Sequence, residues 1–123
     1  MDKKNCLVCK LNKSRKFRVL ETNYWLVDKS FDIDLSGLFF LKTKRHVQNI
    51  EDLTTFESKE LGPTLLRITK VSKEKSKAKR VIVMCLGLKD PHVHFWIVPV
   101  TNDNLNEIKG IFKAVKKLAD KYR

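Results

Sequence analysis

The sequence has no long hydrophobic run. Across 123 residues, no stretch reaches the roughly 18 consecutive apolar residues that a membrane-spanning helix requires. The start of the chain, residues 1–4, carries a carboxylate and two lysines and lacks the apolar core of a secretion signal. These absences exclude a membrane-spanning helix and predict an intracellular, cytoplasmic protein.

Proline and glycine are also scarce, with three and four residues respectively. No stretch rich in proline, glycine or serine divides the chain, and no internal repeat or low-complexity tract occurs. Hydrophobic residues make up 42% and charged residues 33%, which is typical of a globular rather than a disordered chain. We therefore expect residues 1–123 to form a single domain large enough for a hydrophobic core.

Only three cysteines occur: Cys6 and Cys9 in a C-x-x-C motif, and a lone Cys85. Without a secretion signal, a disulfide framework is not expected. C-x-x-C indicates a metal site, a redox pair or simply two buried thiols, and it precedes the first predicted strand, which argues against the redox alternative. Cys85 falls on a predicted buried strand, so we expect it in the core.

Acidic residues are few relative to basic ones, 14 against 26, and the net charge is +12. A positive field attracts phosphates, whether on nucleotides, nucleic acid or anionic lipid. A general role in solubility explains the charge equally well. Basic residues gather around the C-x-x-C motif and between residues 70 and 80, and if they bound nucleic acid the affinity would fall steeply with salt.

Apolar and β-branched patterning predicts two groups of strands separated by a helix. A capping box at Thr54 and Glu57 opens the helix, whose apolar positions recur at helical spacing and in which Gly62-Pro63 should produce a kink or a break. A last helix is expected from Asn102 or Asp103. The strands are expected at residues 17–21, 24–28, 38–42, 81–85 and 92–98. This order predicts an α+β fold with a mostly antiparallel five-stranded sheet and two main helices.

The last helix is amphipathic by pattern. Its lysines lie around the helix in positions expected to be solvated. Its apolar positions are expected to face the core: Leu105, Ile108, Ile111, Phe112, Val115 and Leu118.

Residues 91–99 hold two of the three histidines in a strand-like run. Strand side chains alternate between faces, so His92, His94, Trp96 and Val98 are expected on one face. Imidazole serves as a metal ligand when neutral and as a nucleophile or acid–base group near neutral pH. Two cysteine thiolates supply half of a tetrahedral zinc site, and the remaining donors would come from His46 and His92, or from His94.

Residues 92–99 (His-Val-His-Phe-Trp-Ile-Val-Pro) resemble the signature of the histidine triad (HIT) superfamily, H-φ-H-φ-H-φ-φ followed by proline, where φ is apolar. Three further segments are similar to this family in the same order. They are the cysteine knuckle of zinc-bearing members at about residues 1–15, the nucleotide-pocket strand at residues 24–28, and the segment Lys44-Arg45-His46-Val47.

The resemblance implies a function as well as an α+β, often homodimeric, fold. It implies a nucleotide phosphohydrolase or nucleotidyl transferase that acts at a nucleotide α-phosphate, with His94 as the nucleophile that forms a nucleotidyl-histidine. It implies substrate contacts from Asp28, His92 and the position of Trp96, and a dinucleoside polyphosphate or another nucleotide as substrate. It also implies a structural zinc bound by Cys6, Cys9, His46 and His92.

Three residues depart from the family pattern. Trp96 replaces the third histidine, and an indole offers one N–H donor but no proton to a leaving group. Leu88 replaces a glutamine after Gly87, which removes a phosphate contact. Thr43 replaces the proline of the family's P-K-x-H-V segment, which we expect to matter little. Two alternatives therefore stay open: a catalytically weak nucleotide-binding module, and a basic zinc-containing protein that binds nucleic acid.

Overall fold

The computed structural model describes residues 3–122. Residues 1–2 of the expected knuckle and residue 123 of the expected domain lie outside this range. The helices and strands follow in chain order: 3₁₀ helix η1 (Lys3–Asn5), α1 (Leu7–Asn12), β1 (Arg18–Glu21), β2 (Trp25–Lys29), β3 (Phe39–Thr43), 3₁₀ helix η2 (Ile50–Asp52), α2 (Thr55–Ser76), β4 (Val81–Met84), β5 (His94–Pro99) and α3 (Leu105–Lys121).

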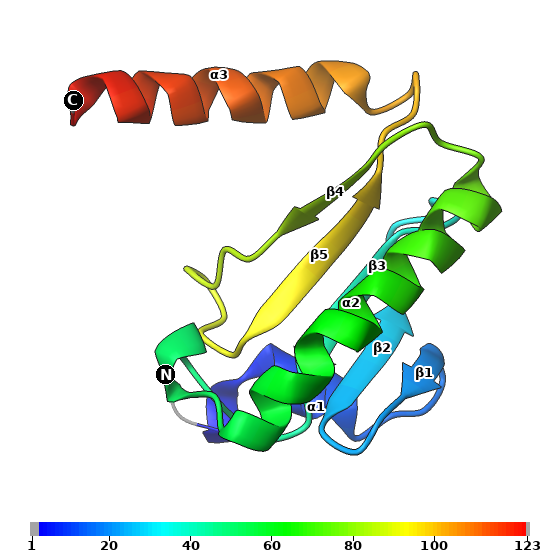
Figure 1. The fold of residues 1–123 in the computed structure, drawn as a ribbon, viewed down its shortest axis with the longest axis vertical. Helices are drawn as coiled ribbons and strands as arrows, with labels where there is room; N and C mark the ends of the chain where they lie inside the picture. The colour runs from blue at the N-terminus through cyan, green and yellow to red at the C-terminus, as the bar shows by residue number, and fades with distance from the viewer. Residues whose placement is uncertain (1–2, 123) are drawn as a thin grey trace.

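The five strands form one antiparallel sheet in the order β1-β2-β3-β5-β4. Because β5 pairs between β3 and β4, the strand that carries His94 lies inside the sheet rather than at its edge. Helix α2 runs across one face of this sheet (Figure 1). The predicted α+β class and the antiparallel five-stranded sheet are confirmed.

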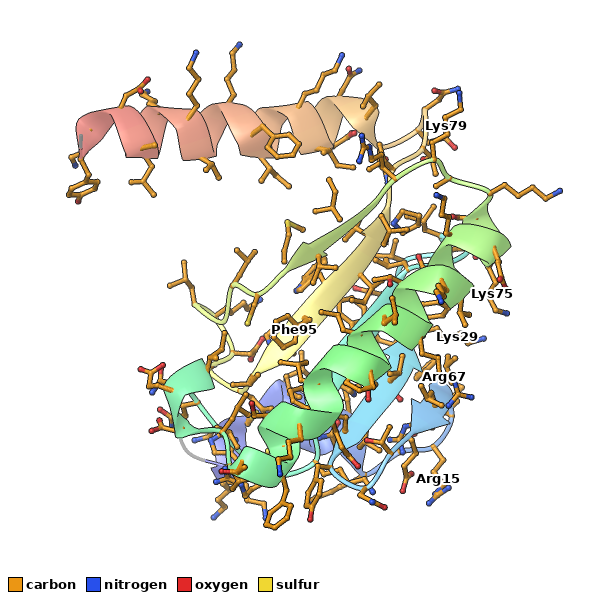
Figure 2. All side chains as sticks on the ribbon, viewed as in Figure 1. Arg15, Lys29, Arg67, Lys75, Lys79 and Phe95 are labelled. Atoms are coloured by element: carbon orange, nitrogen blue, oxygen red, sulfur yellow. The ribbon has the colours of Figure 1, made fainter. Side chains whose placement is uncertain are left out.

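The core lies between α2 and this covered face of the sheet. Trp25, Leu41, Ile68 and Ile97 are almost completely buried there, and Phe95 packs against them (Figure 2). The indole Nε1 of Trp25 donates to a main-chain carbonyl of α2 at 2.9 Å, so the largest core side chain is also hydrogen-bonded. The side chains of the opposite sheet face remain available for a site.

Helix α2 begins at the predicted capping box. The Thr54 hydroxyl accepts from the backbone N–H of Glu57, and the Glu57 carboxylate accepts from the backbone N–H of Thr54. The expected break at Gly62-Pro63 is wrong, because α2 continues without interruption from residue 55 to 76. Pro63 lies on the exposed face of the helix, where water can satisfy the carbonyl that loses its N–H partner.

The predicted burial of the last helix is wrong at most positions. Of its apolar residues, Ile108 is buried, whereas Ile111, Phe112, Val115 and Leu118 are 43–59% exposed. Figure 1 shows the reason: α3 leaves the end of β5 and extends away from the sheet, and in Figure 2 the side chains of its outer part stand clear of the other elements. The pattern is that of an amphipathic helix, but within residues 3–122 most of its apolar face is left uncovered.

Two smaller expectations are also corrected. Asn104, rather than Asn102 or Asp103, occupies the N-cap position of α3. Cys85 is exposed rather than in the core, because β4 ends at Met84 and is the edge strand of the sheet that residues 3–122 form. Within the described residues, no helix combines the length and the apolar character needed to cross a membrane.

Candidate functional site

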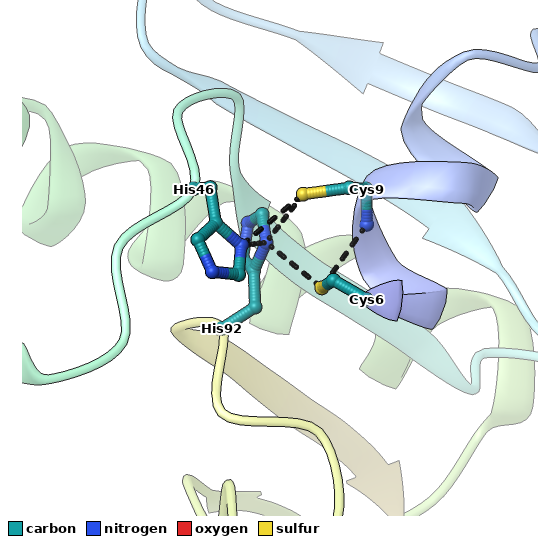
Figure 3. Close-up of side chains that lie close together, drawn as sticks. All are labelled: Cys6, Cys9, His46 and His92. Atoms are coloured by element: carbon teal, nitrogen blue, oxygen red, sulfur yellow. Dashed lines mark hydrogen bonds between the residues drawn. The ribbon is translucent and has the colours of Figure 1, made fainter. Parts of the chain in front are cut away.

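Cys6, Cys9, His46 and His92 converge from three separate segments of the chain (Figure 3). One potential ligand atom from each lies within 4.8 Å of all the others. His92 Nδ1 is 3.5 Å from Cys6 Sγ, 3.3 Å from Cys9 Sγ and 3.3 Å from His46 Nδ1. The ligand atoms of a tetrahedral zinc ion are about 3.3–3.8 Å apart, so the three separations from His92 Nδ1 are those expected between ligands of one ion.

Helix α1 places the two sulfurs. Cys6 is its N-cap residue, and the Cys6 sulfur accepts from the backbone N–H of Cys9 at 3.4 Å. Both cysteines are buried, and the helix between them turns their side chains to the same side. The C-x-x-C motif therefore opens a helix without following a strand, which agrees with the discounting of a redox pair.

His92 is oriented by Thr43, a residue that the sequence analysis treated as a minor departure. The Nε2 atom of His92 lies 2.9 Å from the carbonyl oxygen of Thr43 and 3.0 Å from its hydroxyl. Because the carbonyl can only accept, Nε2 carries the proton, which leaves the Nδ1 lone pair directed at the cluster. A hydrogen bond of this kind fixes the tautomer of a metal-ligating histidine.

The ionisation of the cluster suits metal binding. Burial, helped by the nearby His46, His94 and Lys42 charges, lowers the pKa of His92 to about 4, so its imidazole is neutral near pH 7. Burial and the neighbouring Cys6 raise the pKa of the Cys9 thiol to about 11. Two buried cysteines beside two histidines form a donor set whose thiols a bound cation would convert to thiolates. The residues fit a metal ion.

His92 does not lie on the predicted strand. β5 begins at His94, so the expected shared face of His92 and His94 is wrong, and His92 is completely buried in the connection before the strand. The alternation holds from His94 onward: His94 and Trp96 line a cleft, whereas Phe95 and Ile97 belong to the core.

The cleft lies on the sheet face opposite α2 and has a volume of about 430 Å³. Its apolar wall comes from α1, with Leu7, Val8 and Leu11. Its polar floor comes from three adjacent strands. The lining side chains from the sheet are Asp28, Lys29, Phe40, Lys42, His94 and Trp96.

His94 is held in one tautomer. Its Nδ1 lies 2.6 Å from the carbonyl oxygen of His92, so Nδ1–H donates and the Nε2 lone pair is left free. The acceptor belongs to the residue whose ring completes the cysteine–histidine cluster. Any restraint on the His92 backbone therefore also restrains the His94 ring.

Trp96 occupies the position of the missing third histidine. It lines the cleft and packs edge-on against Phe40, with ring centroids 4.9 Å apart at 78°. Leu88, where the family pattern has glutamine, is 95% exposed. Its side chain therefore projects into solvent.

Asp28 is not a free carboxylate. Arg18 Nε donates to its Oδ1 and Lys42 Nζ donates to its Oδ2, both at 2.6 Å. The sequence analysis did not single out Lys42. In the sequence, Lys42 follows the apolar run Leu38 to Leu41 at the end of a predicted strand. A lysine in that position is ordinarily interpreted as a charge in solvent.

The basic residues near the knuckle line a separate hollow. It has a volume of about 540 Å³, and its walls carry five lysines. The lining residues are Lys3, Lys4, Cys9, Lys10, Asn12, Lys13 and Lys44.

Comparison with known proteins gives similarity of structure without similarity of sequence. No family profile matches the chain, and no curated protein matches it significantly in sequence. A hypothetical protein from Leishmania major has a TM-score of 0.69 at 21% identity, over 94% of this chain and 99% of the other. A HIT-like protein involved in cell-cycle regulation from Bartonella henselae has a TM-score of 0.69 at 22% identity, over 80% and 81%. A HIT family hydrolase from Legionella pneumophila has a TM-score of 0.61 at 19% identity, over 80% and 95%.

Proposed function

We propose that this chain, which has the fold of the histidine triad proteins, is a nucleotide phosphohydrolase or nucleotidyl transferase, with residues 1–123 as one domain. The observation that carries the proposal is the state of His94. Its ring is fixed by the His92 carbonyl, and its free Nε2 lies in a cleft with an apolar wall and cationic side chains. Such a cleft suits a ligand with an apolar ring and a phosphate.

The chemistry follows from the two nitrogens of His94. Nε2 attacks the α-phosphorus, a phosphorus–nitrogen bond forms, and the bond to the leaving oxygen breaks with its electron pair. Positive charge then develops on the imidazole, and the His92 carbonyl stabilises it through Nδ1–H at 2.6 Å. In the second step water or another acceptor attacks phosphorus, the phosphorus–nitrogen bond breaks, and the acceptor's proton is released to solvent.

Asp28, Trp96 and the backbone of His92 complete the proposed substrate site. Trp96 supplies one indole N–H and an aromatic face, but no proton for the leaving oxygen. Water must therefore protonate the leaving group. We expect a working but slow enzyme.

We propose zinc for the cysteine–histidine cluster, with Cys6, Cys9, His46 and His92 as ligands. Two sulfur and two nitrogen donors, gathered here within 4.8 Å of one another, are an ordinary ligand set of structural zinc. When bound, zinc supplies a rigid cross-link between α1 and the start of β5. All four ligands come from the protein, so no position remains for a substrate, and the role is structural.

Intact-protein mass spectrometry tests the nucleophile. After brief exposure to a mixed pool of nucleoside polyphosphates and phosphoramidates, we expect the parent protein to gain the mass of one nucleotidyl group and His94→Ala to gain none. Phosphate release should fall by at least about 1,000-fold in the same variant, since it removes the group that forms the intermediate.

The same experiment separates the alternatives. Nucleotide binding without an adduct or turnover above that of His94→Ala would indicate a binding module. Equal turnover by parent and variant would contradict the mechanism.

We also propose that the chain forms a homodimer through the exposed apolar face of α3. This face and β4 border a groove of about 320 Å³ with an almost entirely apolar lining. A second copy offers the same surface, as a two-fold dimer requires. We expect sedimentation velocity to show a dimer that Phe112→Ser converts to monomer, whereas Lys117→Ser, on the charged side of the same helix, leaves it intact. A monomeric parent protein would remove the proposal.

Nucleic-acid binding is the second candidate function. The observation in its favour is the lysine-lined hollow beside the knuckle. If this function is right, the affinity for nucleic acid should fall steeply as the salt concentration rises. That response would distinguish nucleic-acid binding from hydrolysis of a small nucleotide.

A further inference from the structure

Lys42 is a buried cation inside the proposed substrate cleft. Its side chain is 3% exposed, and its Nζ lies 2.6 Å from Asp28 Oδ2. Asp28, itself 6% exposed, already has a second cation, because Arg18 Nε donates to its other oxygen at 2.6 Å. One buried carboxylate therefore faces one buried and one partly buried cation.

Arg18 uses four of its five N–H donors within the protein. Besides Asp28, it donates to the carboxylate of Glu21 at 3.2 Å and to the main-chain carbonyls of Asn12 and Ser14 at 3.3 and 3.1 Å. These hydrogen bonds of Arg18 connect the C-terminal end of the knuckle to β1 and β2. Neutralising Asp28 and holding it in place require no further cation.

Lys42 is in a different position. Among residues 3–122, Asp28 is the acceptor that its ammonium contacts, and an ammonium has three N–H donors. Burial lowers the pKa of Lys42, and the bond and charge of Asp28 act against this shift. A buried cation with unused donors is unfavourable unless an anion or another acceptor completes its surroundings.

The sheet register places Lys42 beside the proposed nucleophile. Lys42 and His94 are directly paired across β3 and β5, and paired residues project from the same face. Both side chains line the cleft, together with Trp96. The cation therefore lies next to the place where the phosphate of a ligand would meet His94, on the strand adjacent to the one that lacks the third histidine.

We infer that Lys42 is a substrate-binding residue that contacts the phosphate attacked by His94, and that Asp28 positions the Lys42 ammonium. This inference rests on the proposed function for the nature of the anion. It replaces the expected direct contact of Asp28 with the substrate, here the hydroxyls of a nucleotide sugar, because each oxygen of that carboxylate already accepts a short charged hydrogen bond. Binding should therefore depend strongly on phosphate and little on the sugar hydroxyls.

Calorimetric titration of the metal-loaded, full-length protein tests the inference. The probes are nucleoside 5′-monophosphates, their 2′-deoxy forms and the matching nucleosides. We expect Lys42→Met to weaken monophosphate binding by about 10- to 100-fold, the range for one hydrogen bond to a charged group, and to leave nucleoside binding within about threefold. Ribo- and deoxyribonucleotides should bind the parent protein with similar affinity.

Three variants serve as controls. Lys70→Met removes an exposed cation on α2, across the sheet from the cleft, and it should leave the phosphate contribution intact. Lys42→Arg keeps the charge and should restore most of the affinity lost in Lys42→Met. Asp28→Asn should weaken monophosphate binding without creating a preference between ribose and deoxyribose.

The outcomes distinguish this inference from the proposed function. Equal losses of nucleoside and monophosphate binding in Lys42→Met, or none, would overturn the role of Lys42. A protein that binds no nucleotide but binds pyrophosphate through Lys42 would overturn the proposed function and keep the phosphate contact. Failure to bind any phosphate-containing probe would overturn both.

Discussion

Replacing Trp96 by histidine is expected to raise the rate of phosphate release by about 100-fold or more. A positioned general acid contributes roughly 10²–10⁴ in rate, and the indole at this position has no proton to give. Trp96 and His94 are two residues apart on one strand and line the same cleft, so an imidazole at position 96 would face the leaving oxygen. Its smaller ring fits within the space that the indole occupies.

Two controls make this expectation specific. Trp96→Phe removes the indole N–H but keeps an aromatic ring against Phe40, so it should not accelerate the reaction. Steady-state kinetics across the pH range should show a new ionisation near the pKa of histidine in Trp96→His alone. Equal rates in the parent protein and Trp96→His, with both folded, would show that protonation of the leaving group does not limit turnover.

Replacing Cys9 by serine is expected to abolish stoichiometric zinc binding and to lower the melting temperature by about 10 °C or more. Structural zinc sites contribute about 10–16 kcal/mol of apparent binding free energy in small peptides, so loss of even about 3 kcal/mol would shift a domain of this size by that amount. The Cys9 sulfur lies 3.2 Å from His46 Nδ1 and 3.3 Å from His92 Nδ1. Its replacement therefore removes the sulfur donor that is close to both histidine nitrogens.

Cys85→Ser is the matched control, because Cys85 is exposed and is not part of the cluster. It should retain the metal and the melting temperature of the parent. A strong chelator should destabilise the parent and Cys85→Ser but leave Cys9→Ser unchanged.

Cys9→Ser should also lose activity, because the carbonyl that holds His94 belongs to His92. Full metal content in Cys9→Ser would show that the cluster is not the metal site.

The sequence by itself determined the fold class, the order of the elements and the residues that meet in the cluster. Alternation of apolar residues identifies strands because it reports a local period, and the Thr54–Glu57 capping box identifies the start of α2 because both partners lie within one turn. Cys6, Cys9, His46 and His92 followed from the family resemblance, because the motifs that carry them are local in sequence.

Predictions from local sequence patterns were wrong where the burial of a residue depends on contact with a distant element. The apolar face of α3 has the pattern of a core helix, yet no element within residues 3–122 lies against most of it. Cys85 follows an edge strand, and position along the chain does not reveal an edge. His92 belongs to the strand by sequence alternation, but its ring lies with Cys6 and Cys9 before the strand begins.

Only the tertiary structure decided which atoms face one another. The Thr43 carbonyl that sets the His92 tautomer, the His92 carbonyl that sets the His94 tautomer, and the Lys42–Asp28 pair depend on strand register and on contacts between distant segments. A shift of one residue in the register of β3 would turn Lys42 to the opposite face and remove it from the cleft. The chain's pattern shows which residues can perform chemistry, and long-range packing determines the distances and protonation states with which they do so.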